Sequence, residues 1–365
     1  MIRVLIITTV GLGFYGITNS VMNYYRNMDK TDFQIDFVNP AIIPQRLKKE
    51  INDNGGTVYE IIMRNYRPLS YMGHLAKIIK KGNYDIVHCH GNSATLAVEL
   101  VVAKLCKVKV RIAHSHNSTC DHMRVHNVLK PLFHLCYTHA FACSEKAGNW
   151  IYGSKPFTVI HNGIPVKNFF YKEEMREQYR KLLGYEENKV IGHIGHFSYQ
   201  KNQEFLVQVF SKLYKKDHNY RLLLIGDGDL QGEVRKQVKE LGLETAVTYY
   251  GETLEVSNLL QAMDVFVFPS RFEGLGIVVI EAQTSGLPCI VSDAIPIEAK
   301  VTDLIHYLSL NDSHDTWADK IIELEQMDRN ENAMRVQEVM KQSRYSIENE
   351  VGKLQNLYYE YVMKK

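Results

Sequence analysis

The stretch that decides the fold is Val265-Phe266-Val267-Phe268-Pro269-Ser270-Arg271-Phe272-Glu273-Gly274-Leu275-Gly276-Ile277-Val278-Val279-Ile280-Glu281-Ala282. Its first four residues are all apolar, which predicts a strand buried on both faces that ends at Pro269. A glycine-rich loop then carries Glu273, and a helix is expected to begin near Gly276. Glu281 should lie about two turns into that helix. A buried strand followed directly by a helix is typical of a parallel sheet covered on both faces.

Short apolar runs alternate with longer amphipathic stretches through all 365 residues. Helices are expected at Leu69–Lys81, Leu96–Leu105 and Asn127–Cys136. The repeated pattern predicts an α/β protein with two Rossmann-like, doubly wound parallel-sheet domains and a cleft between them. Further strands are expected at Arg3–Thr8, Gln34–Val38, Val58–Ile62, Asp85–His88, Val110–Ala113, Ala140–Cys143, Thr158–Ile160, Val190–Ile194, Leu222–Ile225, Thr248–Tyr250 and Cys289–Val291.

The turn His161-Asn162-Gly163-Ile164-Pro165 precedes a charged stretch at Lys172–Arg180 and is the best candidate for a domain boundary. We therefore expect one domain over residues 1–165 and a second over residues 166–345. A chain of this length suits two domains, each with an ample core. Ligands of doubly wound sheets bind at the carboxyl ends of the strands, so the loops after strands are where a site is expected.

Composition excludes several classes of protein. Hydrophobic residues make up 45% and charged residues 23%, which is ordinary for a soluble globular chain. The six cysteines form no C-x-x-C pair and lie mostly in apolar runs, as reduced thiols of a cytosolic protein do. No apolar run approaches the length of a membrane span. We expect a cytoplasmic protein.

The charge is divided unevenly along the chain. Residues 1–165 hold 19 Lys and Arg against 10 Asp and Glu, a net +9, whereas the remainder holds 24 against 31, a net −7. This asymmetry predicts an anionic surface partner for the first half, such as a membrane. A basic cluster of Arg64, Arg67, Lys77, Lys80 and Lys81 surrounds the helix expected at Leu69–Lys81, where the docking face is expected. The alternative is that the apolar residues of this helix face the sheet and its lysines are solvated.

A literal G-x-G-x-x-G occurs at Gly11-Leu12-Gly13-Phe14-Tyr15-Gly16, with Asp36 twenty residues beyond it. Such glycines can bring a pyrophosphate close to backbone amides, which would indicate a dinucleotide site. Two features argue against it: Asp36 lies inside its expected strand, and Phe14 and Tyr15 are bulky. We expect instead that Gly16 frees backbone amides at a helix start that faces the interdomain cleft.

The second half holds a better constellation. The amides of Leu275, Gly276 and Ile277 should be free at the helix start, where they suit phosphate or hydroxyl oxygens. Glu273 and Glu281 could grip different hydroxyl groups of one ligand. The alternative is two solvated glutamates beside a glycine-rich turn.

Three other strand ends belong with this segment. Gly192–Asn202 reads as a strand, a glycine turn and then Lys201, whose ammonium could hold a diphosphate. Leu224-Ile225-Gly226-Asp227-Gly228-Asp229 and Tyr250-Gly251-Glu252 are glycine-marked strand ends that could flank a nucleoside.

Together these motifs resemble a known family, the retaining family 4 glycosyltransferases of the GT-B fold, and among them the bacterial capsule and exopolysaccharide enzymes. In the second half the resemblance rests on G-x-x-x-x-x-K-N, L-I-G-D-G, Y-G, E-G-L-G-x-x-x-x-E-A and G-x-P. In the first half it rests on four marks: Asp85–Gly91, Ile112–Asn117, Ala142–Glu145 and Ile160–Gly163. It covers essentially the whole chain. It also implies that a helix over residues 346–365 packs back on the N-terminal, acceptor-side domain.

The resemblance assigns roles to residues. Lys201 would hold the donor diphosphate, Glu281 the ribose hydroxyls and Glu273 the transferred sugar, while His116 would lie beside that sugar. Where the family has an arginine as its first diphosphate cation, this chain has His196, which is only partly charged near neutrality. The implied catalytic residues are His116, Glu273 and Lys201. The implied donor-binding residues are Gly16, His196, Lys201, Gly226, Tyr250, Glu273, Gly274, Leu275, Gly276, Ile277 and Glu281.

The resemblance also implies a reaction. The enzyme would move a hexose or N-acetylhexosamine from a nucleotide diphosphate, expected to be UDP, to a saccharide or lipid-linked acceptor, with retention of configuration. No cofactor and no metal are expected, because Lys201 and helix N-termini can stabilise the leaving diphosphate. Asp227 and Asp229 are expected to be local caps. Neither a protein nucleophile nor a nucleic-acid partner is expected.

Three other readings remain open. His88, His90, His114 and His116 form two H-x-H pairs at successive strand ends, which would suit a metal hydrolase, although no carboxylate completes the set. We expect these histidines to be hydrogen-bonded polar groups. A sugar-nucleotide epimerase of the same architecture would use the same donor grip. A non-catalytic nucleotide-sugar-binding subunit is the third reading.

Overall fold

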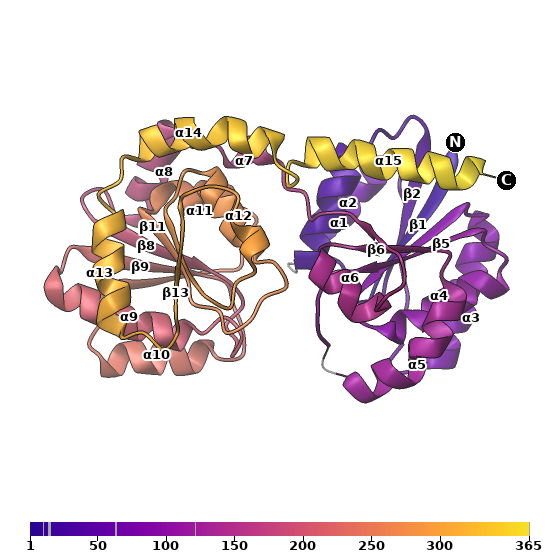
Figure 1. Ribbon diagram of the computed structural model, residues 1–365, viewed down its shortest axis with the longest axis horizontal. Helices are drawn as coiled ribbons and strands as arrows, with labels where there is room; N and C mark the ends of the chain where they lie inside the picture. Colours follow the sequence, from indigo (N-terminus) through magenta and orange to yellow (C-terminus); the bar gives the residue numbers. More distant parts are fainter. Residues whose placement is uncertain (10, 14–15, 63, 121, 365) are drawn as a thin grey trace. The chain divides into compact units, whose positions relative to one another are not determined.

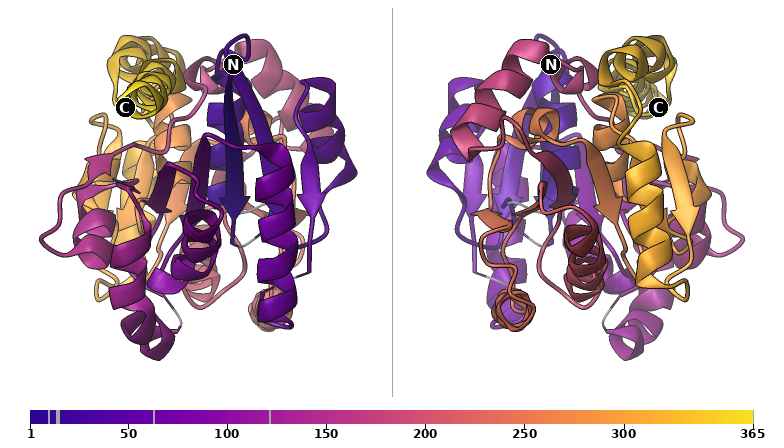
Figure 2. Two further views of the ribbon diagram at one scale, coloured as in Figure 1. Left: turned by 90° about the vertical axis from the view of Figure 1, so that its right-hand side faces the viewer. Right: turned by 90° about the vertical axis from the view of Figure 1, so that its left-hand side faces the viewer.

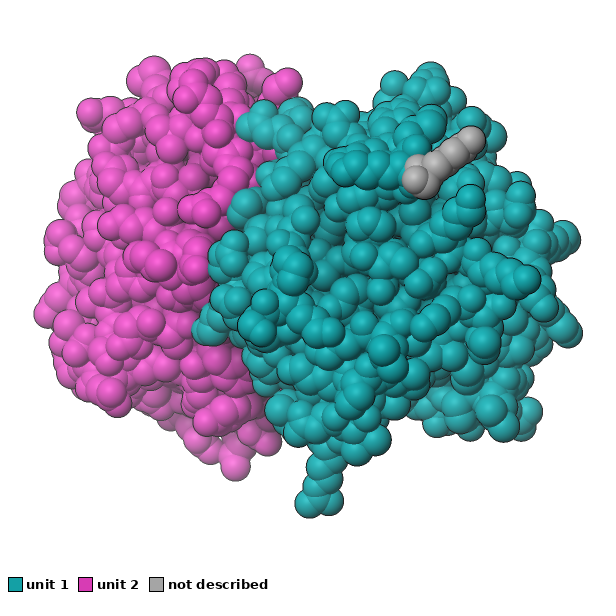
Figure 3. All heavy atoms as spheres, turned by 45° about the vertical axis from the view of Figure 1, so that its right-hand side comes forward, with its two compact units in different colours: residues 1–164, 347–365 teal, residues 165–346 magenta. Residues whose placement is uncertain are grey.

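A computed structural model describes residues 1–9, 11–13, 16–62, 64–120 and 122–364. The chain forms two compact units, which Figure 3 colours teal and magenta. Unit 1 comprises Met1–Ile164 and Ile347–Lys365, and unit 2 comprises Pro165–Ser346. No helix among the described residues is both long and apolar enough to cross a membrane.

Unit 1 is built on one parallel sheet with the strand order β3-β2-β1-β4-β5-β6-β7. All neighbouring strands pair in parallel, and the indigo and purple arrows of unit 1 point the same way in Figure 2. The order reverses between β1 and β4, so the chain winds outward in both directions from this point. The strands are β1 (Ile2–Thr8), β2 (Phe33–Asn39), β3 (Val58–Glu60), β4 (Ile86–Gly91), β5 (Val110–Ser115), β6 (His139–Ala142) and β7 (Thr158–Val159).

Helices cover both faces of this sheet (Figure 1). One core contains apolar side chains of α3, α4, α5 and α6. The other core contains those of α1, α2 and α15, so the last helix covers the same face as the first. The helices of unit 1 are α1 (Gly16–Asn27), α2 (Gln45–Asp53), α3 (Pro68–Gly82), α4 (Ala97–Leu105), α5 (Met123–Cys136), α6 (Glu145–Tyr152) and α15 (Ile347–Met363), with a 3-10 turn η1 at Ala94–Leu96.

Unit 2 repeats the design with the strand order β10-β9-β8-β11-β12-β13, again parallel throughout. Its strands are β8 (Lys189–Ile194), β9 (Tyr220–Ile225), β10 (Val247–Gly251), β11 (Val265–Phe268), β12 (Cys289–Ser292) and β13 (Ile305–Leu308). Its helices are α7 (Val166–Phe169), α8 (Glu173–Leu183), α9 (Gln203–Lys216), α10 (Gln231–Glu240), α11 (Val256–Ala262), α12 (Ile277–Thr284), α13 (His314–Leu324) and α14 (Arg329–Gln342), with a 3-10 turn η2 at Ile297–Ala299.

The structure corrects the sequence analysis at two points and favours one of its two alternatives at a third. The strand β13 was not expected, because it is only four residues long and mixes polar with apolar side chains. Helix α12 begins at Ile277, so Glu281 lies little more than one turn into it rather than two. The apolar residues Tyr71, Leu75 and Ile79 of α3 are buried in the core, so this helix presents no apolar docking face through them.

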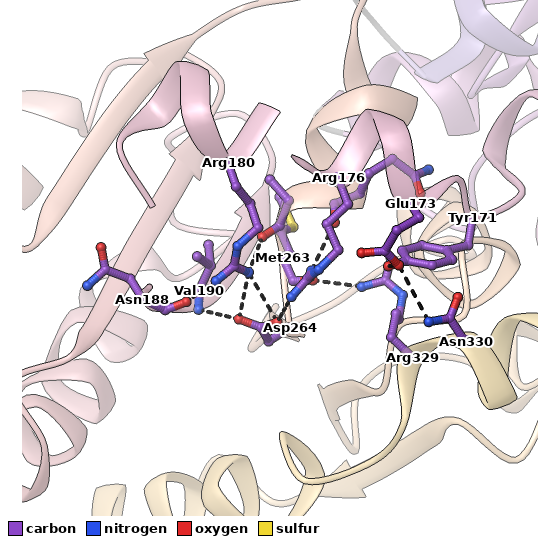
Figure 4. Close-up of polar contacts among 12 residues, drawn as sticks. Tyr171, Glu173, Arg176, Arg180, Asn188, Val190, Met263, Asp264, Arg329 and Asn330 are labelled. Atoms are coloured by element: carbon purple, nitrogen blue, oxygen red, sulfur yellow. Dashed lines mark hydrogen bonds and ion pairs between the residues drawn. The ribbon is translucent and has the colours of Figure 1, made fainter. Parts of the chain in front are cut away.

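An ion-pair cluster holds the amino-terminal ends of β8 and β11 together (Figure 4). Asp264, just before β11, accepts from the amide of Val190 in β8 at 2.7 Å. The same carboxylate accepts from Arg176 at 2.5 Å and from Arg180 at 3.2 Å, both on α8. The guanidinium of Arg329 on α14 donates to the carbonyl of Met263 at 2.6 Å. These bonds fix the relative position of the two strands at the centre of the sheet.

Candidate active site

The order of unit 2's strands reverses between β8 and β11, which are neighbours in the sheet. The loops that leave their carboxyl ends, residues 195–202 and 269–276, therefore lie side by side. This is the switch point where doubly wound sheets bind ligands. It brings together two segments that the sequence analysis had treated as separate motifs.

Lys201 and Glu273 meet at this point. The Lys201 Nζ lies 2.5 Å from Glu273 Oε1, and both side chains are largely buried, with 19% and 8% exposed. The same ammonium lies 4.6 Å from the centre of the Phe268 ring, a cation–π contact. An ammonium has three donors, so the pair with Glu273 leaves donors for a further anion.

Backbone bonds hold the two loops in place. The amide of Arg271 donates to the carbonyl of Gln200 at 2.8 Å, and the Arg271 guanidinium donates to that of Tyr199 at 2.6 Å. Asn202 has left-handed backbone geometry with φ of 59° and donates from its side chain to the Pro269 carbonyl at 3.1 Å. The lysine is therefore carried by an ordered loop.

The amino terminus of α12 opens beside this pair. Gly276 caps the helix with φ of 80°, a conformation that suits glycine. In the described part of the chain, the amides of Leu275, Gly276 and Ile277 donate to no acceptor. Free amides and the positive end of the helix dipole favour an anion or hydroxyl oxygens here.

Glu281 lies on the same helix and is partly exposed. Burial of its carboxyl group raises its pKa to about 8. Among the described residues no side chain pairs with it, whereas Glu273 is engaged by Lys201. A desolvated carboxyl group without a protein partner is a candidate ligand-binding group.

Two glycine loops flank the site. Gly226 follows β9 with φ of 131°, and a Cβ there would lie 2.3 Å from the carbonyl oxygen of Gly195. Only glycine lets the two loops approach this closely. His196, which follows Gly195, is exposed. The Asp227 carboxylate accepts from the amide of Gly228 at 2.8 Å, a bond within its own turn.

Tyr250 lies near the end of β10, and its hydroxyl lies 3.5 Å from a carboxylate oxygen of Glu255. The neighbouring Gly251 forms a bridge with Gly226, which joins the end of β10 to the glycine loop after β9. Tyr250 and Gly274 thus lie at the same edge of the sheet as Lys201, but the structure shows no bond from them to it.

Gly16 and His116 belong to unit 1. Gly16 begins α1, whereas Phe14 and Tyr15 lie outside the described residues. His116 follows β5, is buried, and lies with Nε2 2.9 Å from His90 Nδ1 and Nδ1 3.3 Å from Asn162 Oδ1. Burial lowers its pKa to about 4, so its ring is neutral at physiological pH.

Asp36 cannot serve a dinucleotide. It is 1% exposed within β2, and its carboxylate accepts from the amide of Thr57 at 2.8 Å and from the Tyr84 hydroxyl at 2.7 Å. The sequence analysis argued against a dinucleotide site because Asp36 was expected to lie inside a strand. The structure places Asp36 inside β2, as expected.

Three residues near Lys201 or His116 were given no role by the sequence analysis. Phe268 supports the Lys201 ammonium, and Asn162 binds His116. His193 is buried in β8; its Nδ1 bonds the Val267 carbonyl at 2.9 Å, and burial lowers its pKa to about 4. A polar residue inside an otherwise apolar strand was the available signal for His193.

Both halves of the chain match family models. Residues 14–168 match the model described as Glycosyltransferase Family 4, and residues 174–342 match the model described as Glycosyl transferases group 1. The boundary between the matches lies near the junction of the two units.

Relatives and solved structures agree with the two models. EpsF of Bacillus subtilis is 31% identical over 364 residues, which cover 95% of this chain and 94% of EpsF. The Escherichia coli UDP-Gal:alpha-D-GlcNAc-diphosphoundecaprenol alpha-1,3-galactosyltransferase is 27% identical over 60% of each chain. Anabaena HepE, solved with UDP and glucose, superposes with a TM-score of 0.82 at 17% identity, over 98% of this chain and 100% of HepE. The fold is GT-B, as expected, and the chain belongs to the glycosyltransferases that combine a Family 4 domain with a group 1 domain.

Proposed function

We propose that this glycosyltransferase transfers a hexose or N-acetylhexosamine from a UDP-sugar to a saccharide or lipid-linked acceptor in surface polysaccharide synthesis, with retention of configuration. The observation that carries the proposal is the group of side chains and amides at the β8/β11 switch point. Lys201 offers positive charge there, and the amino terminus of α12 offers unpaired amides. Glu281 on the same helix offers an unpaired carboxyl group among the described residues.

Each part suits one part of a nucleotide-sugar. Ribose hydroxyls would donate to Glu281, the diphosphate would accept from Lys201 and His196, and the sugar would contact Glu273 and the α12 amides. Gly226 and Tyr250 would flank the nucleoside. UDP as the nucleotide is supported by the Escherichia coli relative, a UDP-Gal galactosyltransferase, and by the complex of HepE with UDP and glucose.

The proposed chemistry needs no protein nucleophile. The acceptor oxygen attacks the anomeric carbon from the face that the leaving phosphate vacates, the bond from this carbon to the phosphate oxygen breaks, and that phosphate takes the acceptor's proton. Negative charge grows on the diphosphate as the bond breaks. Lys201 and the α12 amides would stabilise this charge. Such electrostatic stabilisation by fixed donors is usually the largest single contribution to catalysis. We therefore propose that the donor site works without a divalent metal.

A membrane contact is part of the proposal, because a lipid-linked acceptor resides at a bilayer. More exposed apolar side chains lie on α5 than on α3: Val125, Val128, Leu132 and Leu135 of α5 are all exposed, by between 42% and 77%. Residues 100–144 hold six Lys and Arg and one acidic residue. Exposed apolar residues among basic ones suit an anionic bilayer surface. We propose the inner face of the cytoplasmic membrane as the working location.

The test incubates the purified chain with UDP-glucose, UDP-galactose and UDP-N-acetylglucosamine. UDP release is measured with and without N-acetylglucosamine linked by diphosphate to a short polyprenol. Acceptor-dependent release, with a product of unchanged anomeric configuration by NMR, would support the proposal. Conversion of one UDP-sugar to another without acceptor would identify an epimerase. Binding of UDP-sugars without turnover on any acceptor would indicate a non-catalytic subunit.

A further inference from the structure

The core of unit 1 holds four histidines at the carboxyl ends of two neighbouring strands. His88 and His90 lie on β4, His114 lies on β5, and His116 follows it. The strands pair so that His90 is in register with His114. Because alternate residues of a strand share a face, all four rings lie together, and each side chain is 1–8% exposed. Nothing in the proposed transfer uses three of them.

The protonation of two rings follows from their partners. The Asn162 side-chain oxygen accepts from the Ser20 hydroxyl at 3.0 Å and lies 3.3 Å from His116 Nδ1. An amide oxygen can only accept, so His116 carries its proton on Nδ1. In the neutral ring, which carries one proton, Nε2 is then a bare acceptor. That nitrogen lies 2.9 Å from His90 Nδ1, which must therefore be the donor.

The consequence falls on His90. The neutral ring has a single proton, and the bond to His116 places it on Nδ1. Its Nε2 is then a lone pair. In the part of the chain that the structure describes, this buried nitrogen has no hydrogen-bond partner. A buried acceptor with no donor is costly, and its position calls for a ligand.

The other two rings offer matching nitrogens. His88 Nδ1 lies 2.6 Å from the Tyr358 hydroxyl, and His88 Nε2 lies 3.2 Å from His114 Nδ1. If Tyr358 accepts from His88, the Nε2 of His88 is also a lone pair. Two nitrogens bound to one tetrahedral zinc at about 2.0–2.1 Å are separated by about 3.3 Å. The separation of His88 Nε2 and His114 Nδ1 matches this value.

We propose that His88, His90 and His114 together bind one late first-row transition-metal ion, with Zn²⁺ as the representative, inside unit 1. One ring nitrogen of each lies within 4.8 Å of those of the other two. Neutral imidazoles suit Zn²⁺, Cu²⁺ and Ni²⁺, whereas Mg²⁺ and Ca²⁺ prefer oxygen ligands. A cavity of about 20 Å³ borders all three histidines and has room for about one water, which could complete the coordination.

Two groups behind the ligand rings would hold these rings in place. Tyr358 on α15 would orient His88 through its second nitrogen, as groups behind metal-bound histidines commonly do. His116 would orient His90 in the same way, because its Nε2 accepts from His90 Nδ1. The ion would thus be structural, in a site of unit 1 that is distinct from the proposed donor site of unit 2.

The experiment uses the untagged full-length chain. Metal content is measured by mass spectrometry as purified, and after removal of metal with a strong chelator and refilling with Zn²⁺ or Co²⁺. We expect one ion per chain, visible d–d bands with Co²⁺, and a higher thermal midpoint with Zn²⁺ than without. His90→Gln, His88→Gln and His114→Gln should each abolish the bands.

Two matched histidines serve as controls. His126 is buried in the same unit and accepts from the Ala94 amide, and His116 contacts His90 without belonging to the proposed ligands. His126→Gln and His116→Gln should keep one ion per chain. A wild-type chain that binds neither Zn²⁺ nor Co²⁺ would overturn the proposal, as would undiminished binding by the folded His90→Gln variant. If the ligand variants do not fold, the metal content and Co²⁺ spectrum of the wild type still decide.

Discussion

Lys201 and Glu273 are 72 residues apart in the chain, yet the lysine Nζ lies 2.5 Å from the carboxylate of Glu273. The pair exists because β8 and β11 are neighbours at the point where the sheet reverses its order. It holds the ammonium in place, and the centre of the Phe268 ring lies 4.6 Å from the same nitrogen. If a diphosphate binds here as proposed, a positively charged group that is already oriented would lose little entropy on binding it.

We expect Lys201→Ala to lower turnover by about 100-fold or more, the range for loss of one electrostatic contact in the transition state. Steady-state UDP release measures the effect, and thermal denaturation checks that the variant folds. Lys212→Ala is the control, because Lys212 lies on α9 and its exposed ammonium pairs with the exposed Asp315. Turnover close to normal in a folded Lys201→Ala variant would remove this lysine from the mechanism.

Glu281 couples stability to pH. Burial raises its pKa from the usual 4.5 to about 8, so the folded chain prefers the protonated form. The stabilisation that this preference provides is complete below pH 4.5 and is lost as the pH rises through about 8. Glu281→Gln should therefore melt at a higher temperature than wild type at pH 9, with a smaller difference at pH 5. Glu252→Gln, which changes an exposed glutamate of the same unit, should show no such trend.

Glu281→Gln and Glu281→Ala should both weaken nucleotide binding. If the ionised carboxylate accepts from ribose hydroxyls, UDP affinity should also increase as the pH rises toward 8. Calorimetric titration with UDP at several pH values measures both effects. Unchanged UDP affinity in these variants would count against the ribose role.

The donor site should need no divalent metal. EDTA in the assay should leave turnover intact, and Mg²⁺ or Mn²⁺ should not raise it, because in the proposed mechanism Lys201 and the α12 amides would stabilise the leaving group. Loss of activity with EDTA that Mg²⁺ or Mn²⁺ restores would show this account to be wrong. Loss that only Zn²⁺ restores would instead point to the histidine site of unit 1.

The α5 face should bind anionic vesicles. Wild type should sediment with anionic but not neutral vesicles, and salt should release it, because each basic residue near such a surface contributes about 1 kcal/mol. Replacing Val128, Leu132 and Leu135 by asparagine should abolish sedimentation. Replacing Lys77, Lys80 and Lys81 of α3 by glutamate should weaken it less, because the apolar side of α3 is buried. Equal sedimentation of the α5 variant and wild type would show that α5 does not mediate membrane binding.

Asp264→Asn should destabilise the chain by about 3 kcal/mol or more, since it leaves Arg176 and Arg180 without their carboxylate partner. Urea unfolding monitored by fluorescence gives the change in free energy. The matched control is Asp319→Asn, which removes an exposed pair with Lys216 and should cost less than about 1 kcal/mol. Similar values for the two variants would contradict the importance of the buried cluster.

Much of the fold could be read from local pattern. A strand buried on both faces is apolar throughout. Runs such as Val265–Phe268 can therefore be recognised as strands without knowledge of which strands lie beside them. The alternation with helices then implies parallel sheets, and two such sheets formed. β13 escaped notice because an edge strand has fewer covered faces and tolerates polar residues. The donor roles of Lys201, Glu273 and Glu281 came from family resemblance and stay predictions.

By itself, the sequence determined which residues could carry chemistry: two glutamates around a helix start, a lysine after a glycine turn, and four histidines at strand ends. Only the tertiary structure decided their partners. Pairing of Lys201 with Glu273 depends on which strands are neighbours, and the burial of the α3 apolar face depends on which side of the helix meets the sheet. The lone pair on His90 emerges from a chain of bonds that begins at Ser20 and Asn162. Contacts between distant segments have no local signature, because strand order and side-chain burial arise only when the whole unit folds.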